Sequence, residues 1–330
     1  MHKGFAAYSL PDSTDITVVK GSFVPFNFAT NLQGSAFLLN AWEGKPEMLC
    51  GEHSTNDQLV NELFGTLVMQ ESASDFVETT DFVWKEMIES AKRQMEMGMV
   101  QKVVLSRSVK VSVSTELFTA FKRAVAENPQ AFVYFVYHSA HGCWMGATPE
   151  LLLAGKQNHY ETMALAGTLT PEQNNWGEKE VKENTVTDNF IRHMIDQCGG
   201  TNLLAENRKE IKAGHLRHLQ VNYKFNLDKG NEIQLLNSLH PTPAVGGYPR
   251  EQALRFISEL ERHQRGLYTG WIGVATPERL SVFVNLRCAR LFDNAAILYA
   301  GAGINSESDW QIEWRETAEK MEVIGKYLNG

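Results

Sequence analysis

Two pairs of glutamates with the same spacing are the first candidates for chemistry in this sequence. Glu180 and Glu183 form one pair and Glu313 and Glu316 form the other, and the surrounding patterns predict a helix for each pair. Because residues three apart share a helix face, each helix could present two carboxylates to one point. Mg²⁺ takes one or two protein oxygens and leaves its other positions to water and substrate, which suits this supply. The same spacing is also common on solvated helix faces.

Arg287 stands in a mostly apolar row over residues 282–291, which predicts a strand. An arginine in such a row either pairs with a buried carboxylate or holds a ligand carboxylate through two hydrogen bonds. Two glycine-rich segments, 165–168 and 300–304, each follow a predicted strand. Their backbone N–H groups could approach an anion closely, and a plain turn is the alternative for both.

By their positions alone, Lys102 and Glu150 give only weak signals. Lys102 falls on the polar face of a predicted strand, where a lysine is normally solvated, and Glu150 follows Pro149 at the start of another. Sequence spacing does not bring the two side chains together.

Hydrophobic periodicity predicts the elements that must position these residues. A helix over residues 81–97 precedes a strand over 100–113 in which apolar and polar residues alternate. Further helices are predicted over 116–127, from about 177, and over 232–239, 251–261 and 309–328. Further strands are predicted over 131–138, 143–147, 151–153, 160–167, 202–204 and 216–227, with a hairpin over 280–299. This order is neither strict βαβ alternation nor all-β, and it predicts one large α+β domain.

Composition narrows the class of protein. The chain has 330 residues, 43% hydrophobic and 21% charged, which is the balance of a folded protein, and no linker or low-complexity run divides it. Its net charge of -8 disfavours nucleic acid. No apolar run reaches the roughly 18 residues of a membrane helix, and no signal-peptide pattern opens the chain. We therefore expect a cytoplasmic protein, and four scattered cysteines favour buried free thiols.

Eight short segments, in order along the chain, resemble the chorismate-utilising enzymes. They are residues 102–107, 148–152, 165–168, 240–247, 265–268, 286–289, 300–303 and 314–317. The resemblance implies a single chorismate-binding α+β domain over 1–330, with two β-sheets packed as a sandwich, flanking helices and an active site in a deep cleft. Residues 1–77 would be the family-variable part and 78–328 the catalytic core.

Within that family the segments are most similar to the isochorismate synthases. The resemblance implies that Lys102 is the base that activates water for attack on C2 of chorismate, and that Glu150 is the acid that protonates the departing C4 hydroxyl. It implies Mg²⁺ as cofactor, held by Glu183 and Glu316 with support from Glu180 and Glu313. The implied chorismate-binding residues are Gly167, Thr168, His218, Tyr268, Arg287, Gly301, Gly303 and Lys320.

Other branches of the family remain alternatives. The lysine at 102 and the loop 240–247 argue against an aminating synthase, so we expect no glutaminase subunit, and we favour a monomer. A salicylate synthase, which goes on to eliminate pyruvate, and a non-catalytic paralogue are further alternatives. The helix that bears Glu183 has Asn184 where relatives usually carry a histidine. The choice of Glu183 over Asp188 as metal ligand rests on its spacing from Lys179.

Overall fold

The fold is built mainly from β-strands, many of which pair with strands that are distant in the sequence. The computed structural model describes residues 2–26, 34–67, 69, 76–171, 174–213 and 215–329. Within these residues every strand pairing is antiparallel. The strands are β1 His2–Ser9, β2 Thr17–Pro25, β3 Ala36–Asn40, β4 Glu47–Ser54, β5 Lys102–Ser112, β6 Phe132–His138, β7 Gly142–Thr148, β8 Leu151–Lys156, β9 His159–Leu169, β10 Thr201–Ala205, β11 Lys209–Ala213, β12 Leu216–Asn226, β13 Gly247–Tyr248, β14 Trp271–Ala275, β15 Arg279–Val284, β16 Cys288–Leu291 and β17 Ala295–Ile304.

Hydrogen bonding joins these strands into one continuous network with two arms. In the first arm the neighbours run β11, β12, β9, β8, β15, β14 and β3, and β10 also pairs with β12. In the second arm they run β1, β6, β7, β16, β17, β5 and β13. Strands β4 and β2 connect the arms. The family resemblance implies two sheets, whereas hydrogen bonds join the described strands into one continuous sheet that turns back on itself.

The two arms face each other across a shared apolar core. Phe132 of β6, in the second arm, stacks on Phe283 of β15, in the first, with ring centroids 4.9 Å apart. Phe37 of β3 and Tyr134 of β6 belong to the same buried cluster. Aromatic side chains bury large areas, so this layer holds the arms together.

A row of three glycines crosses the strands that connect the arms. Gly21 lies opposite Gly4 on one side and opposite Gly51 on the other. A Cβ atom on Gly21 would lie 2.0 Å from the carbonyl oxygen of Cys50, and one on Gly51 would lie 1.9 Å from that of Lys20. Glycine inside a strand marks a close backbone approach or a tight bend, and here the row lies where the network bends from one arm to the other.

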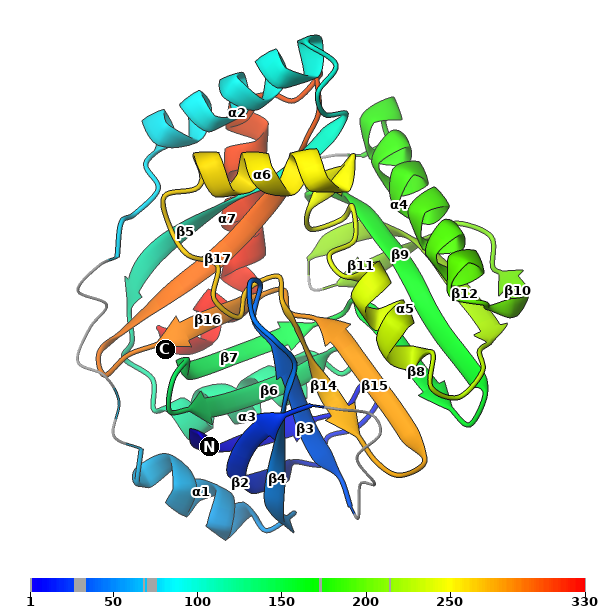
Figure 1. Ribbon diagram of the computed structural model, residues 1–330. Coiled ribbons are helices and arrows are strands. Elements are labelled where there is room, and N and C mark those ends of the chain that lie inside the picture. Colours follow the sequence, from blue (N-terminus) through cyan, green and yellow to red (C-terminus); the bar gives the residue numbers. More distant parts are fainter. Residues whose placement is uncertain are drawn as a thin grey trace.

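Helices cover the outer faces of both arms (Figure 1). Helices α4 and α5 pack on the first arm, while α1, α3 and α7 pack on the second. Helices α2 and α6 pack against β5 and β17. Their bounds are α1 Asp57–Gly65, α2 Asp81–Glu96, α3 Leu117–Glu127, α4 Glu178–Gln197, α5 Glu232–Leu239, α6 Arg250–Leu260 and α7 Trp310–Leu328. None of the described helices has the length and apolarity needed to cross a membrane.

Four local predictions differ from the structure. The glycine-rich segments 165–168 and 300–304 lie within β9 and β17 rather than after strands. The predicted strand over 282–291 is broken between β15 and β16. The polar face of β5 is buried along with its apolar face as far as Ser108, because β17 and β13 flank the strand and helices cover it. All four cysteines are free as predicted, but Cys50 is exposed.

Candidate active site

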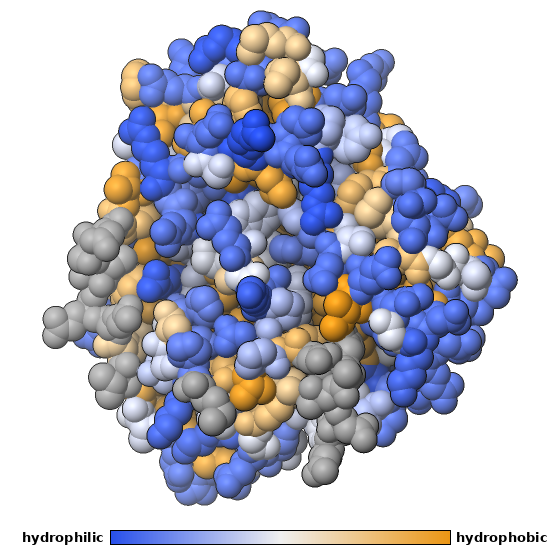
Figure 2. Space-filling view, in the orientation of Figure 1, coloured by the Kyte–Doolittle hydropathy of each residue, from blue (hydrophilic) through white to orange (hydrophobic). Residues whose placement is uncertain are grey.

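A pocket between the two arms gathers most of the predicted site residues. It is lined by β9 and β12 of the first arm and by β5 and β17 of the second. The face of the molecule in Figure 2 is mostly hydrophilic and is hollowed near its centre. The predicted residues that line the pocket are Glu150, Gly167, Thr168, Glu183, His218, Tyr268, Arg287, Gly301, Gly303 and Lys320.

Glu150 is the buried acid of this pocket. It lies between β7 and β8, is 3% exposed, and its backbone oxygen accepts a hydrogen bond from the N–H of Val284. Burial raises the pKa of the Glu150 carboxyl to about 8, although the nearby cations Lys102, Arg287 and Lys320 act in the opposite direction. A carboxyl group with that pKa is mostly protonated at pH 7 and can donate a proton.

Arg287 is aimed into the pocket by the break between β15 and β16. Its φ of 49° is in the left-handed region, which is uncommon for a residue other than glycine. Burial lowers the pKa of Arg287 to about 10, so the guanidinium remains charged at neutral pH. A buried cation in a pocket is suited to binding the carboxylate of a ligand.

His218, on β12, contacts the guanidinium of Arg287 and orients it. Its Nε2 lies 2.7 Å from Nη2 of Arg287, and its Nδ1 lies 3.2 Å from Oγ1 of Thr168. Because arginine can only donate, Nε2 must accept, so the proton of neutral His218 is on Nδ1. Burial, with Arg287 and Lys320 nearby, lowers the pKa of His218 well below its usual value, which keeps the ring neutral.

Lys102 and Glu183 form a buried ion pair beside the pocket. The Nζ of Lys102 lies 2.9 Å from Oε1 of Glu183, which projects from α4. Burial alone would raise the pKa of Glu183, but Lys102 and Lys179 lower it overall, so this carboxylate is ionised. A Cβ atom on Gly303 would lie 2.1 Å from Oε1 of Glu183, so any larger residue at this position would collide with the ion pair.

The remaining predicted carboxylates lie on α4 and α7 but do not line the pocket. Glu316 pairs with Lys320 at 2.7 Å, and Glu313 pairs with Lys179. Burial and the neighbouring Glu316 raise the pKa of Glu313 to about 7. Oε2 of Glu180 accepts the N–H of Gly177 at 2.9 Å and so caps α4.

Sequence reasoning gave no role to the network around Arg265. The guanidinium of Arg265 donates to the backbone oxygens of Val104 and Val245, to Oγ1 of Thr269 and to both carboxylate oxygens of Glu261. Val104 and Val245 line the pocket, as does Tyr268 beside Thr269. The network therefore fixes one wall, and its only signal in the sequence is the segment 265–268.

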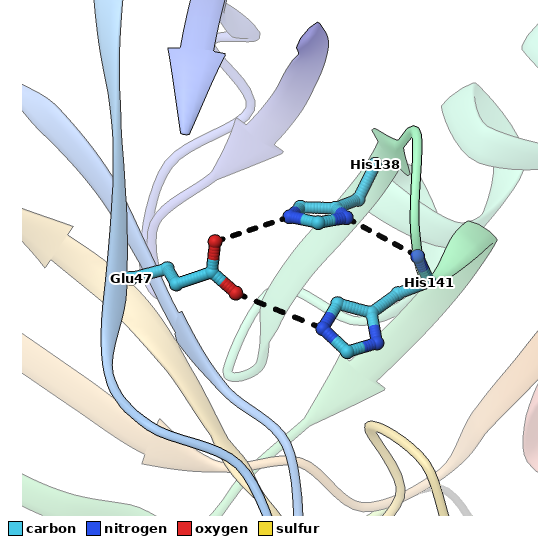
Figure 3. Close-up of side chains that lie close together, drawn as sticks. All are labelled: Glu47, His138 and His141. Atoms are coloured by element: carbon cyan, nitrogen blue, oxygen red, sulfur yellow. Dashed lines mark hydrogen bonds and ion pairs between the residues drawn. The ribbon is translucent and has the colours of Figure 1, made fainter. Parts of the chain in front are cut away.

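A second cluster of ligand-type side chains lies outside the pocket (Figure 3). Glu47 of β4 faces His138 at 3.3 Å and His141 at 3.7 Å, each through Nε2. The Nδ1 of His138 accepts two backbone N–H groups, from Ala140 and His141. The proton of neutral His138 is therefore on Nε2 and points at Glu47, where a metal would need a lone pair. This arrangement is a hydrogen-bonded clamp between β4 and the turn after β6.

The class of protein follows from a comparison with known families. Residues 45–329 match the family described as chorismate binding enzyme, and the chain belongs to that family. The resemblance recognised in the sequence is thereby confirmed.

Curated relatives include several isochorismate synthases. Isochorismate synthase EntC of Escherichia coli is 29% identical over 256 residues, covering 73% of this chain and 66% of EntC. Isochorismate synthase MenF of the same organism is 28% identical over 251 residues, covering 72% of this chain and 58% of MenF. Each match therefore spans less than two thirds of the relative's own length.

Solved structures share the fold over nearly the whole chain. The menaquinone-specific isochorismate synthase MenF of Escherichia coli superposes with a TM-score of 0.80 at 22% identity, covering 99% of this chain and 89% of that one. Anthranilate synthase component I of Streptococcus pneumoniae gives a TM-score of 0.71 at 20% identity, covering 93% and 83%.

Proposed function

We propose that this protein is a Mg²⁺-dependent isochorismate synthase, which converts chorismate to isochorismate. The observation that carries the proposal is the meeting in one pocket of a buried, protonated acid, Glu150, and a buried cation, Arg287, with Lys102 in the adjoining wall. The names of the relatives support the same activity. Isochorismate synthases of this kind are isomerases, because the substrate and the product have the same atoms.

The two catalytic side chains would act on opposite ends of the rearranging system. To act as the base, Lys102 must first give up the proton that it carries in its ion pair with Glu183. The neutral amine then takes a proton from water, and the water oxygen bonds to C2 of the ring. The ring double bond shifts, the bond from C4 to its hydroxyl oxygen breaks, and Glu150 protonates that oxygen. One water enters and another leaves, so the reaction balances. Positioned proton transfers of this kind typically contribute about 10² to 10⁴ in rate.

Arg287, Tyr268 and the backbone of Gly301 would bind the enolpyruvyl carboxylate of chorismate, and the ring carboxylate would be left to the metal. Arg287 is charged and oriented by His218, and Lys320 donates to the backbone oxygen of Gly301 at 2.9 Å on β17. The hydroxyl of Tyr268 approaches the same strand, since a Cβ atom on Gly301 would lie 3.0 Å from it. Gly167 and Thr168 complete the wall beside His218.

The carboxylates of α4 and α7 fit a hard divalent cation. Lys179 lies close enough to interact electrostatically with three of these carboxylates, those of Glu183, Glu313 and Glu316. Oε2 of Glu313 is buried and has no hydrogen-bond partner among the described residues. Oxygen donors with excess negative charge suit Mg²⁺. When bound, Mg²⁺ would neutralise and orient a carboxylate of the substrate. Glu183 and Glu316 would hold it, with Glu313 and Glu180 in support.

The test is to incubate the purified protein with chorismate and Mg²⁺ and to separate the products by chromatography, with and without ammonium. We expect isochorismate, no aminated product, and loss of activity in excess EDTA. Salicylate with pyruvate would point to the pyruvate-eliminating branch. Turnover undiminished by EDTA would refute the metal requirement, and no product under any condition would refute the function.

A further inference from the structure

A second, outer pocket lies on the far side of the ion pair between Lys102 and Glu183. It is formed between α4 and residues 305–307, and its lining includes Lys102, Lys182 and Val186. Glu183 and Gly303 line both this outer pocket and the substrate pocket. The ion pair and Gly303 therefore form the wall between the two pockets.

Gly303 makes this wall thin. A Cβ atom there would lie 2.1 Å from Oε1 of Glu183 and 3.0 Å from Cε of Lys102. The two side chains thus rest directly on the backbone of β17, and one residue position separates the pockets. A small molecule beside the amine of Lys102 needs to pass only this wall to reach the substrate.

Lys102 forms part of the outer pocket and is absent from the lining of the substrate pocket. The residue is 4% exposed, and its Nζ makes no hydrogen bond of good geometry among the described residues, although Glu183 lies 2.9 Å away. A buried amine is normally satisfied by protein groups or by ordered water. The outer pocket is the polar space from which water can reach it.

The proposed chemistry needs a water molecule at C2 while the substrate is bound. In the proposed reaction one water enters at C2 while another leaves from C4, and the substrate itself fills the pocket beside Glu150. We propose that the outer pocket is the entry route for the water that Lys102 activates. This inference rests on the proposed function and adds where its nucleophile comes from.

The mouth of the outer pocket is open to solvent. Lys182 lies 3.6 Å from Glu307 across it and 3.4 Å from Glu178 on its own helix, and all three side chains are more than half exposed. Exposed ion pairs of this kind are weak and exchange readily with solvent. Water therefore has access to the outer pocket.

The experiment narrows the outer pocket from each wall. Val186→Trp fills it from α4, and Ser306→Trp fills it from the loop before α7. The matched control is Val181→Trp, the same substitution on the same helix at an exposed position that lines neither pocket. Initial rates give kcat and KM. Chorismate affinity is measured by calorimetry with each substitution placed in a Glu150→Gln background, so that turnover does not interfere.

We expect both filling variants to lower kcat at least tenfold, with KM and the chorismate Kd within twofold of the control. If both retain kcat within twofold of the wild type, the route is overturned and the proposed function stands. If kcat and Kd worsen together in both variants, the substitutions act on the substrate pocket and the route is likewise refuted. A wild type that does not convert chorismate overturns the proposed function and this inference with it.

Discussion

Two buried charge networks in this protein differ in how completely their polar atoms are satisfied. Around Arg265, each guanidinium nitrogen donates to at least one acceptor, and both oxygens of Glu261 are used. Around the pocket, the Nζ of Lys102 has only its ion pair with Glu183, and Oε2 of Glu313 makes no hydrogen bond among the described residues. Satisfied buried charges fix a structure, whereas unsatisfied ones are more often kept for chemistry or for a ligand. Removing a charge should therefore have opposite consequences in the two networks.

The largest expected effect is on turnover in the pocket. Glu150→Gln replaces a carboxyl group that is mostly protonated at pH 7 with an uncharged amide of similar size. We expect turnover to fall by about 10² to 10⁴, the typical contribution of general acid catalysis. The free energy of unfolding in urea should change by no more than about 1 kcal/mol, because no buried charge is left unpaired. Lys102→Ala should also abolish turnover.

The control is Glu251→Gln at an exposed position of α6, which should change neither turnover nor the free energy of unfolding. The pH profile sharpens the assignment. Because the acid must be protonated, kcat/KM should fall as pH rises through about 8, the pKa of Glu150 among Lys102, Arg287 and Lys320. If Glu150→Gln keeps turnover within tenfold of the wild type, Glu150 is not the acid.

The next largest effect is on stability in the satisfied network. Arg265→Ala leaves Glu261 buried without its partner, and breaking a buried pair in this way costs about 3 to 5 kcal/mol. Urea unfolding measures the loss. The control is Lys326→Ala, which removes the half-exposed pair with Glu127 and should cost at most about 1 kcal/mol. Equal losses in the two variants would contradict the contrast between the networks.

The smallest effect concerns the clamp around Glu47. Burial lowers the pKa of His138 to about 4, with His141 and His2 lowering it further and Glu47 raising it. An unfolded histidine titrates near 6.5, so between pH 6.5 and 4 the unfolded chain binds the extra proton and stability falls as pH falls. His138→Gln should make this fall in Tm shallower. A Tm profile that keeps the wild-type slope would show that His138 does not carry it.

Local patterns predicted the helices α2 to α7, because the signals for a helix are local, but they did not predict α1. The helix predicted over 116–127 is α3, Leu117–Glu127, and the one over 309–328 is α7, Trp310–Leu328. The glycines of segment 300–304 indicated a turn after a strand. The segment is instead part of β17, because it pairs with β5, which is distant in the sequence. Neither β11 nor β14 was predicted.

The candidate site came from ordered segments of a family resemblance rather than from spacing. No local rule places Lys102 against Glu183, because 81 positions separate them and only the fold brings α4 to the start of β5. The positive φ of Arg287 could not be predicted either, because the apolar residues around it indicate an unbroken strand. The catalytic and metal-binding roles stay predictions.

The interleaved strand order has a consequence for how the protein is made. Strand β17, Ala295–Ile304, lies between β5 and β16 in the second arm, and Gly301 and Gly303 of β17 line the pocket. During synthesis β5 therefore has no β17 to pair with until nearly the whole chain has been made. Folding dominated by such long-range pairings is slow, and unpaired strand edges invite aggregation. A nascent chain that has not reached residue 304 has an open edge and no pocket, so we expect this protein to depend on protection until its synthesis is nearly finished.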